Sequence, residues 1–257
     1  MTFYRLQYLI LRRDGDGMGV QWPAAANASF EWARENGVTA GVAMPAPYAA
    51  PFREMIAAPQ VVHRLEWIMG AGFCTGSDFG VRTLHRGEGR QLIHAGLNYK
   101  SNEYHYVLTE GGRSYAEAVN VSFQLSDSCT GGGGLTLVSA LTSQSVKIDC
   151  SASDRAEWLR VQVPGSHKSS YLLPTSIDGT EDLAGSDGSD GYGRVPQCLV
   201  HPTTQAGDII IFSGFGTGHG VGNWASDHER RLVIASYLSR SLDAARGKRH
   251  WIVAPKL

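Results

Sequence analysis

The sequence contains little that would direct the chain to a membrane or to a nucleic acid. Charged residues make up 18% of its 257 residues, the formal net charge is −1, and lysine and arginine form no long run. Binding to a nucleic-acid polymer or to an anionic membrane is therefore not indicated. No apolar stretch approaches membrane-spanning length, and residues 1–17 lack the small-residue cleavage site of a signal peptide. We expect a cytoplasmic protein, and the oligomeric state stays open.

Cysteine is also scarce. The sequence has four, and no two of them form a CxxC pair; they are Cys74, Cys129, Cys150 and Cys198. This number and spacing argue against a disulfide scaffold and against a zinc knuckle. Reduced thiols are the expected state.

Glycine, in contrast, is abundant, with 31 residues, and turn signals separate about eight short strands from residue 79 onward. Because strands do not alternate with helices, a Rossmann fold is not indicated. We predict a single domain, residues 1–257, with an all-β sandwich or jelly-roll core over residues 79–240. Within it, apolar and polar residues alternate from Val119 to Ser126, which predicts a half-buried strand.

The first 78 residues predict helices and loops that flank this core. A helix is expected from Asn27 to Asn36, since an Asn/Ser capping signal opens the segment. A second is expected from Pro59 to Gly70, because proline suits a first helical turn and glycine ends a helix. Between them, residues 43–52 carry several prolines and predict a loop.

Two glycine-rich segments are interpreted as connections. Residues 131–134 (GGGG) predict a turn between strands and not a phosphate-binding loop, because no helix start follows them. Residues 175–194 form a long polar loop, which is either a lid over a functional site or a solvent-exposed connection.

Two of the nine histidines, His94 and His219, lie in informative surroundings. His94 ends a predicted strand, and His219 follows a strand and a glycine-rich bend. Arg230 comes eleven residues after His219 and opens another strand. Six other histidines show no partner pattern, although two of them, at positions 85 and 105, leave a histidine-rich metal site open; the six are His63, His85, His105, His201, His228 and His250.

Together, these pieces resemble the phytanoyl-CoA hydroxylase-like family of non-haem Fe(II)/2-oxoglutarate oxygenases. The resemblance covers Pro59 to Ser239. It is carried, in order, by the segments LEWIMGAGF, LIHAGLNY, VSFQLSD, GGGGLTLV, VPGSHKSSY, AGDIIIF, HGVGNW and HERR. Residues 139–162 separate two segments that normally run together in the family, so we interpret them as an insertion.

The resemblance implies a double-stranded β-helix with flanking helices, a small-molecule substrate and a facial iron site. His94 and His219 would be the two histidine ligands of Fe(II), which leaves positions for 2-oxoglutarate and O2. Arg230 would bind the distal carboxylate of 2-oxoglutarate, because a guanidinium matches a carboxylate in two parallel hydrogen bonds. His167 and Lys168 would shape a loop at the rim of the site or contact substrate.

The sequence departs from the family where the third iron ligand would lie. The family pattern is His-x-Asp or His-x-Glu, whereas here Gly96 follows His94 and Ala95. Glycine or alanine at this position resembles the halogenases of this superfamily, in which chloride binds iron instead. The implied reaction is chlorination of an unactivated C–H bond.

Two alternatives remain open. The protein would be a hydroxylase if water or a carboxylate such as Glu103 or Glu110 filled the position, and a non-catalytic binding protein if iron were not bound.

The substrate is less defined than the chemistry. Four cations flank the strands of the predicted site and suggest a phosphate group, hence a nucleoside or nucleotide precursor of a natural product. They are equally compatible with solvated charges at strand edges; these cations are Arg82, Arg86, Arg90 and Lys100.

Overall fold

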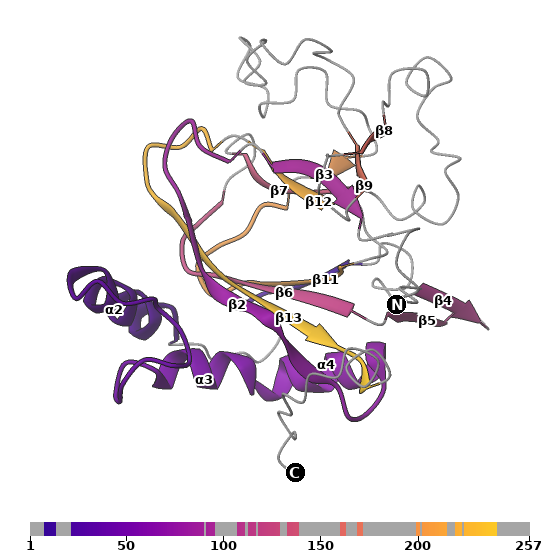
Figure 1. Cartoon of the computed structure of the whole chain (residues 1–257), viewed down its shortest axis with the longest axis horizontal. Helices are drawn as coiled ribbons and strands as arrows, with labels where there is room; N and C mark the ends of the chain where they lie inside the picture. The colour runs from indigo at the N-terminus through magenta and orange to yellow at the C-terminus, as the bar shows by residue number, and fades with distance from the viewer. Residues whose placement is uncertain are drawn as a thin grey trace.

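Two antiparallel sheets lie face to face in the computed structural model (Figure 1). The structure describes residues 8–13, 22–89, 91–95, 107–110, 113–116, 118–128, 133–138, 160–162, 169–171, 199–200, 202–214, 219–222 and 224–240. The first sheet has the order β1 (Tyr8–Leu11), β11 (Ile209–Ser213), β6 (Ala118–Gln124), β13 (Arg230–Leu238) and β2 (Cys74–Leu84). The second has the order β10 (Leu199–Val200), β7 (Gly134–Val138), β12 (His219–Gly222), β3 (Gln91–Ala95), β9 (Ser169–Tyr171) and β8 (Arg160–Gln162). The predicted all-β jelly-roll core is confirmed.

Three helices cover the outer face of the first sheet: α2 (Trp22–Glu35), α3 (Ala50–Ile56) and α4 (Pro59–Met69) (Figure 1). The α4 helix begins and ends as predicted, and Gly70 follows it with φ of 80°. The α2 helix begins at Trp22, before the predicted cap, and Asn27 instead donates a hydrogen bond to the Leu125 carbonyl oxygen at 2.9 Å.

Two elements of the N-terminal flank were not predicted. The α3 helix begins at Ala50, within the segment that we expected to be a loop. Pro51 lies in its first turn, where the missing N–H costs no helical hydrogen bond. The β1 strand, in the flank expected to hold only helices and loops, pairs with β11 at one side of the first sheet. The β2 strand likewise begins at Cys74, before the predicted start of the core at residue 79.

The β6 strand shows why the prediction of a half-buried strand was wrong. Val119, Val121 and Phe123 pack into the core shared with the helices. The intervening Ser122 and Gln124 are also buried, with 1% of each exposed. They lie on the opposite face of β6, which the second sheet covers. Both faces of the strand are therefore largely buried, and Asn120 is the one β6 residue that stays partly exposed.

Part of the space between the sheets is lined by an apolar cluster. Leu135 and Leu137 of β7 pack against Ile210 and Phe212 of β11. Because side chains alternate along a strand, the inward positions of the first sheet are those between the residues that face the helices.

The remaining predictions on connections lie largely outside the described residues. Of the predicted insertion at 139–162, the structure describes only β8, which pairs with β9. The segment 175–194 is not described. Within the described part of the chain, no helix is long and apolar enough to cross a membrane.

A buried carboxylate anchors the segment after β1 to the turn before β11. Asp208 is 1% exposed and accepts hydrogen bonds from Arg12 Nη1 at 2.7 Å and from the backbone N–H groups of Arg13 and Gln205, each at 3.0 Å. Gly207, with φ of 103°, allows the close approach of Arg13.

We predict that Asp208→Asn lowers the free energy of unfolding by about 2–3 kcal/mol, because hydrogen bonds to a buried charged acceptor are lost. Asp227→Asn is the matched control, since that side chain is 88% exposed in its ion pair with Arg86, and its effect should stay within about 0.5 kcal/mol. Chemical denaturation measures both values. Equal effects of the two substitutions would contradict the anchoring role of Asp208.

Candidate functional site

The two histidines singled out by the sequence lie opposite each other in the second sheet. In the pairing of β12 with β3, His219 is the Cα partner of His94, and the register shifts before the next pair, Val221 with Gln91. Residues directly opposite in an antiparallel pair share a face of the sheet. The fold thus brings together two backbone positions that are far apart in the sequence.

The His219 side chain faces the space between the sheets. It is half-buried, and its ring contacts Phe212 of the first sheet edge-on, with ring centroids 5.0 Å apart. Phe212 is fully buried. An imidazole in this position lies close to apolar side chains, which limits the access of water.

Several predicted residues lie outside the described residues, among them Gly96, Glu103, His167 and Lys168. Of His94, the backbone alone is described. Among the side chains that the structure describes, no group of three or more His, Cys, Asp or Glu residues could hold a metal ion. Glu110, a candidate ligand in the hydroxylase alternative, ends β4 (Val107–Glu110), which forms a separate hairpin with β5 (Arg113–Ala116).

Arg230 is a buried cation without a described counter-ion. It is the first residue of β13, and only 4% of it is exposed. Its Nε atom is buried without a hydrogen-bond partner, and no described residue forms a hydrogen bond or ion pair with its guanidinium group. Burial lowers the pKa of Arg230 to about 10, so the group is still charged at neutral pH. A buried charge in this state is costly unless an anion binds it.

Two residues of the second-sheet segments lie against this guanidinium. A Cβ atom on Gly134 would lie 2.9 Å from Nε and 3.1 Å from Cζ of Arg230, and φ of Gly134 is 93°. The Trp224 ring centroid lies 6.0 Å from Arg230 Cζ. The GGGG segment was predicted to be a turn, and its last glycine also leaves the space that Arg230 occupies. Trp224 was not predicted as a site residue, because its presence in the segment HGVGNW was the only sign of it in the sequence.

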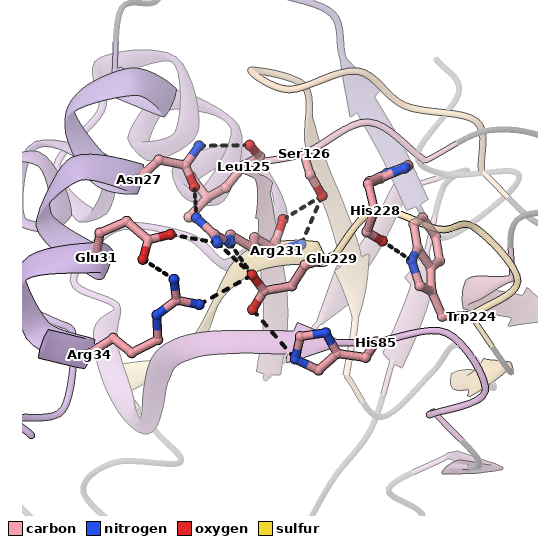
Figure 2. Close-up of polar contacts among 10 residues, drawn as sticks. All are labelled: Asn27, Glu31, Arg34, His85, Leu125, Ser126, Trp224, His228, Glu229 and Arg231. Carbon is pink, nitrogen blue, oxygen red and sulfur yellow. Dashed lines mark hydrogen bonds and ion pairs between the residues drawn. The ribbon is translucent and has the colours of Figure 1, made fainter.

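The neighbouring arginine, Arg231, has the opposite environment (Figure 2). It pairs with Glu229 at 2.5 Å and with Glu31 of α2 at 2.6 Å. Partial burial lowers the pKa of Arg231, but the hydrogen bonds and charges of Glu229 and Glu31 outweigh that effect, and the net shift is upward. Its guanidinium also lies 4.8 Å from the Phe30 ring centroid. Consecutive strand residues face opposite ways, so Arg231 fixes α2 while Arg230 faces inward.

The other described residues that the sequence analysis considered lie at the protein surface near this region. Arg86 pairs with Asp227 at 2.5 Å, and both side chains are exposed. His85 Nε2 lies 3.9 Å from Glu229 Oε1. His228, predicted to be solvated, is exposed and its Nε2 atom also forms a hydrogen bond with the Asp127 carbonyl oxygen at 3.0 Å. Arg90 and Lys100 lie outside the described residues.

Comparison with known proteins shows a shared fold. No model of a protein family matches the sequence, and no curated protein matches it. HygX from Streptomyces hygroscopicus, with nickel and 2-oxoglutarate bound, aligns with a TM-score of 0.59 and 13% identity over 93% of this chain and 85% of HygX.

Two further structures align comparably. The non-haem α-ketoglutarate-dependent carbocyclase SnoK has a TM-score of 0.52 and 14% identity, over 92% of this chain and 81% of SnoK. The epimerase SnoN, in complex with Fe3+, α-ketoglutarate and nogalamycin RO, has a TM-score of 0.51 and 13% identity, over 92% of this chain and 80% of SnoN. The protein therefore has the fold of these three proteins.

The contrast between the two arginines yields a stability prediction. Arg230→Met removes a buried charge that no described residue pairs and should raise the free energy of unfolding by about 1–3 kcal/mol. Arg231→Met leaves Glu229 and Glu31 with Arg34 as their cation in place of two and should lower the free energy of unfolding by about 1–3 kcal/mol. Denaturant titration of both variants without added ligand measures these values. A loss of stability in Arg230→Met as large as that in Arg231→Met would show that Arg230 is a structural residue.

Proposed function

We propose that the protein is a non-haem Fe(II)/2-oxoglutarate-dependent enzyme that modifies an unactivated C–H bond of a small molecule. The observation that carries this proposal is the buried guanidinium of Arg230, which no described residue pairs. Such a group is more often found where a ligand supplies the counter-charge than where it serves stability.

A carboxylate is the ligand that this position suits best. The guanidinium offers donors in a planar fork that matches two carboxylate oxygens. Gly134 leaves room at the guanidinium, and burial strengthens the attraction between opposite charges. HygX and SnoN have this fold and were solved with 2-oxoglutarate or α-ketoglutarate bound, which supports the same dicarboxylate here.

His94 and His219 would hold the iron, since their positions are direct partners in the second sheet. Neutral imidazoles suit Fe(II), and two of them leave coordination positions open. When bound, iron and 2-oxoglutarate supply the activation of O2, with decarboxylation of 2-oxoglutarate to succinate. The chain itself would orient the cosubstrate through Arg230. Phe212 and the leucines of β7 would keep water from the reacting centre.

Chlorination is the specific outcome that we propose, and it rests on Gly96. Without a carboxylate at that position, one coordination position of the metal would have no protein ligand, and chloride would fill it and balance the charge. Hydroxylation is the alternative, with water at the same corner. The names of SnoK and SnoN, a carbocyclase and an epimerase, indicate that this fold supports several outcomes, so the product itself has to be identified.

The proposed substrate is a precursor of a natural product. HygX was solved with hygromycin B bound (TM-score 0.56, 12% identity) and SnoN with nogalamycin RO, which supports a small-molecule substrate. Of the four cations that suggested a nucleotide, Arg86 is engaged at the surface by Asp227. Arg82 of β2 is exposed and lies opposite Leu232, on the same face of the first sheet as Arg230, so among the described cations a phosphate contact would rest on Arg82.

Binding of metal and cosubstrate tests the proposed chemistry. Fe(II) and 2-oxoglutarate added without O2 should give a weak visible charge-transfer band. Arg230→Met should raise the Kd for 2-oxoglutarate by about 100-fold, as expected for loss of a buried charge pair, and should leave Fe(II) binding intact. His219→Ala should lose Fe(II) binding. Arg86→Met, at the surface, is the control and should match the wild type; absence of the band in the wild type would refute the proposal.

The choice between chlorination and hydroxylation is tested at Gly96. Gly96→Asp supplies a carboxylate to the metal and should abolish chlorination and favour hydroxylation. Mass spectrometry of turnover mixtures with chloride, over nucleotides, amino acids and alkaloid scaffolds, separates the chlorinated product from the hydroxylated one. Undiminished chlorination by the variant would remove Gly96 from the mechanism, and a hydroxylated product of the wild type would establish the alternative.

A further inference from the structure

Trp224 is the largest of the fully buried side chains described, with 0% of it exposed. We propose that Trp224 is a positioning residue, which holds the guanidinium of Arg230 in the orientation that the distal carboxylate of the cosubstrate requires. This inference rests on the proposed function. It assigns a role to a residue that takes no part in metal binding.

The backbone of Trp224 is fixed by the turn that joins β2 to β3. Its N–H donates to the Glu88 carbonyl oxygen at 2.7 Å, and its carbonyl oxygen accepts from the Gly87 N–H at 2.8 Å. The Glu88 carboxylate in turn accepts from the His85 N–H at 2.7 Å. A Cβ atom on Gly89 would lie 2.7 Å from the Gly222 carbonyl oxygen, so the turn packs closely on the end of β12.

The side chain of Trp224 is held by a residue that follows it in the sequence. Trp224 Nε1 donates to the His228 carbonyl oxygen at 2.6 Å (Figure 2). The His228 ring packs on the indole at right angles, with centroids 5.1 Å apart. These contacts hold the indole at its polar atom, on its ring and at its backbone. The ring therefore has a single orientation next to Arg230.

Arg230 needs such a support because no described residue forms a hydrogen bond with its guanidinium group. A long arginine side chain has several rotatable bonds, and fixing them costs conformational entropy. The start of the side chain is held through β13, and Gly134 and Trp224 lie close to the guanidinium. The glycine limits its position sterically, and the indole offers it a flat face of negative potential.

The distance decides the size of the expected effect. Arg230 Cζ lies 6.0 Å from the ring centroid, at the outer limit of cation–π attraction. We therefore expect a moderate contribution, about fivefold to twentyfold in the Kd of the cosubstrate. A buried tryptophan also stabilises the fold, and the test must separate these two roles.

The choice of ligand separates positioning from stability. 2-Oxoglutarate carries the distal carboxylate that would bind Arg230, whereas 2-oxobutyrate carries the same 2-oxo acid group without it. Positioning by Trp224 should affect the binding of 2-oxoglutarate but not that of 2-oxobutyrate. If Trp224 had only a structural role, its loss would weaken the binding of both 2-oxo acids or of neither. It would also change the binding of Fe(II).

The experiment compares the wild type with Trp224→Met, which removes the ring, and Trp224→Phe, which keeps an aromatic face but loses the bond to His228. The Kd values for Fe(II), 2-oxoglutarate and 2-oxobutyrate are measured by anaerobic titration of the full chain. Trp224→Met should raise the Kd for 2-oxoglutarate about fivefold to twentyfold. The Kd for 2-oxobutyrate and for Fe(II) should stay within about twofold, as for a site not contacted by Trp224.

Trp224→Phe should raise the Kd for 2-oxoglutarate about twofold to threefold, because the ring is less firmly held. This variant decides the question if Trp224→Met does not fold. Trp32→Met is the matched control: Trp32 stacks on Tyr48 among the helices, with centroids 3.9 Å apart. Trp32→Met should lower the free energy of unfolding without changing the ratio of the Kd for 2-oxoglutarate to the Kd for 2-oxobutyrate.

Three results would overturn the proposal. Unchanged binding of 2-oxoglutarate in both Trp224 variants would refute positioning and leave the proposed function intact. Equal weakening of 2-oxoglutarate and 2-oxobutyrate would assign Trp224 to the structural core. No binding of 2-oxoglutarate by the wild type would refute the proposed function and, with it, this role of Trp224.

Discussion

The structure depends on a constraint at the first residues of β13, where two adjacent arginines meet opposite requirements. Arg231 is surrounded by carboxylates and joins α2 to the first sheet. Arg230 lies between the sheets without a described counter-ion. Alternation along a strand is what allows both, since it separates the two side chains onto different faces. The ion pairs of Arg231 fix the strand that presents Arg230, and their stabilisation offsets part of the cost of an unpaired buried charge.

The same constraint relates the fold to the candidate chemistry. The second sheet brings His94 and His219 into register, while the first sheet supplies Arg230 and an apolar patch that includes Ile210 and Phe212. A polar ligand between the sheets would therefore meet charge at one end and imidazole on the other sheet. The fold is shared with HygX, SnoK and SnoN, and the polar groups within it set what this chain binds.

The sequence predicted features that depend on local signals. Pro59 and Gly70 marked α4, because proline and glycine act on the backbone at their own positions. Prediction from the sequence failed where the burial of a residue depends on elements that are distant in the chain. The alternating pattern of β6 could not show that the second sheet covers Ser122 and Gln124, and prolines before α3 concealed a helix.

The candidate site was predicted unevenly for the same reason. The interval from His219 to Arg230 is a local pattern and led to both residues. Trp224 was missed, because its contacts to Glu88, His228 and Arg230 exist only in the folded chain. Gly134 was recognised as a turn residue, yet its proximity to Arg230 requires two strands from different sheets.

The pairing of β1 with β11 has a consequence for handling the protein. Tyr8 to Leu11 cover the outer side of a strand whose sequence, IIIFS, is almost wholly apolar. A polypeptide lacking those first residues would present this strand as an open hydrophobic edge, which is a template for intermolecular β-sheet association. Truncation at the N-terminus would thus promote aggregation before it affected any residue of the candidate site.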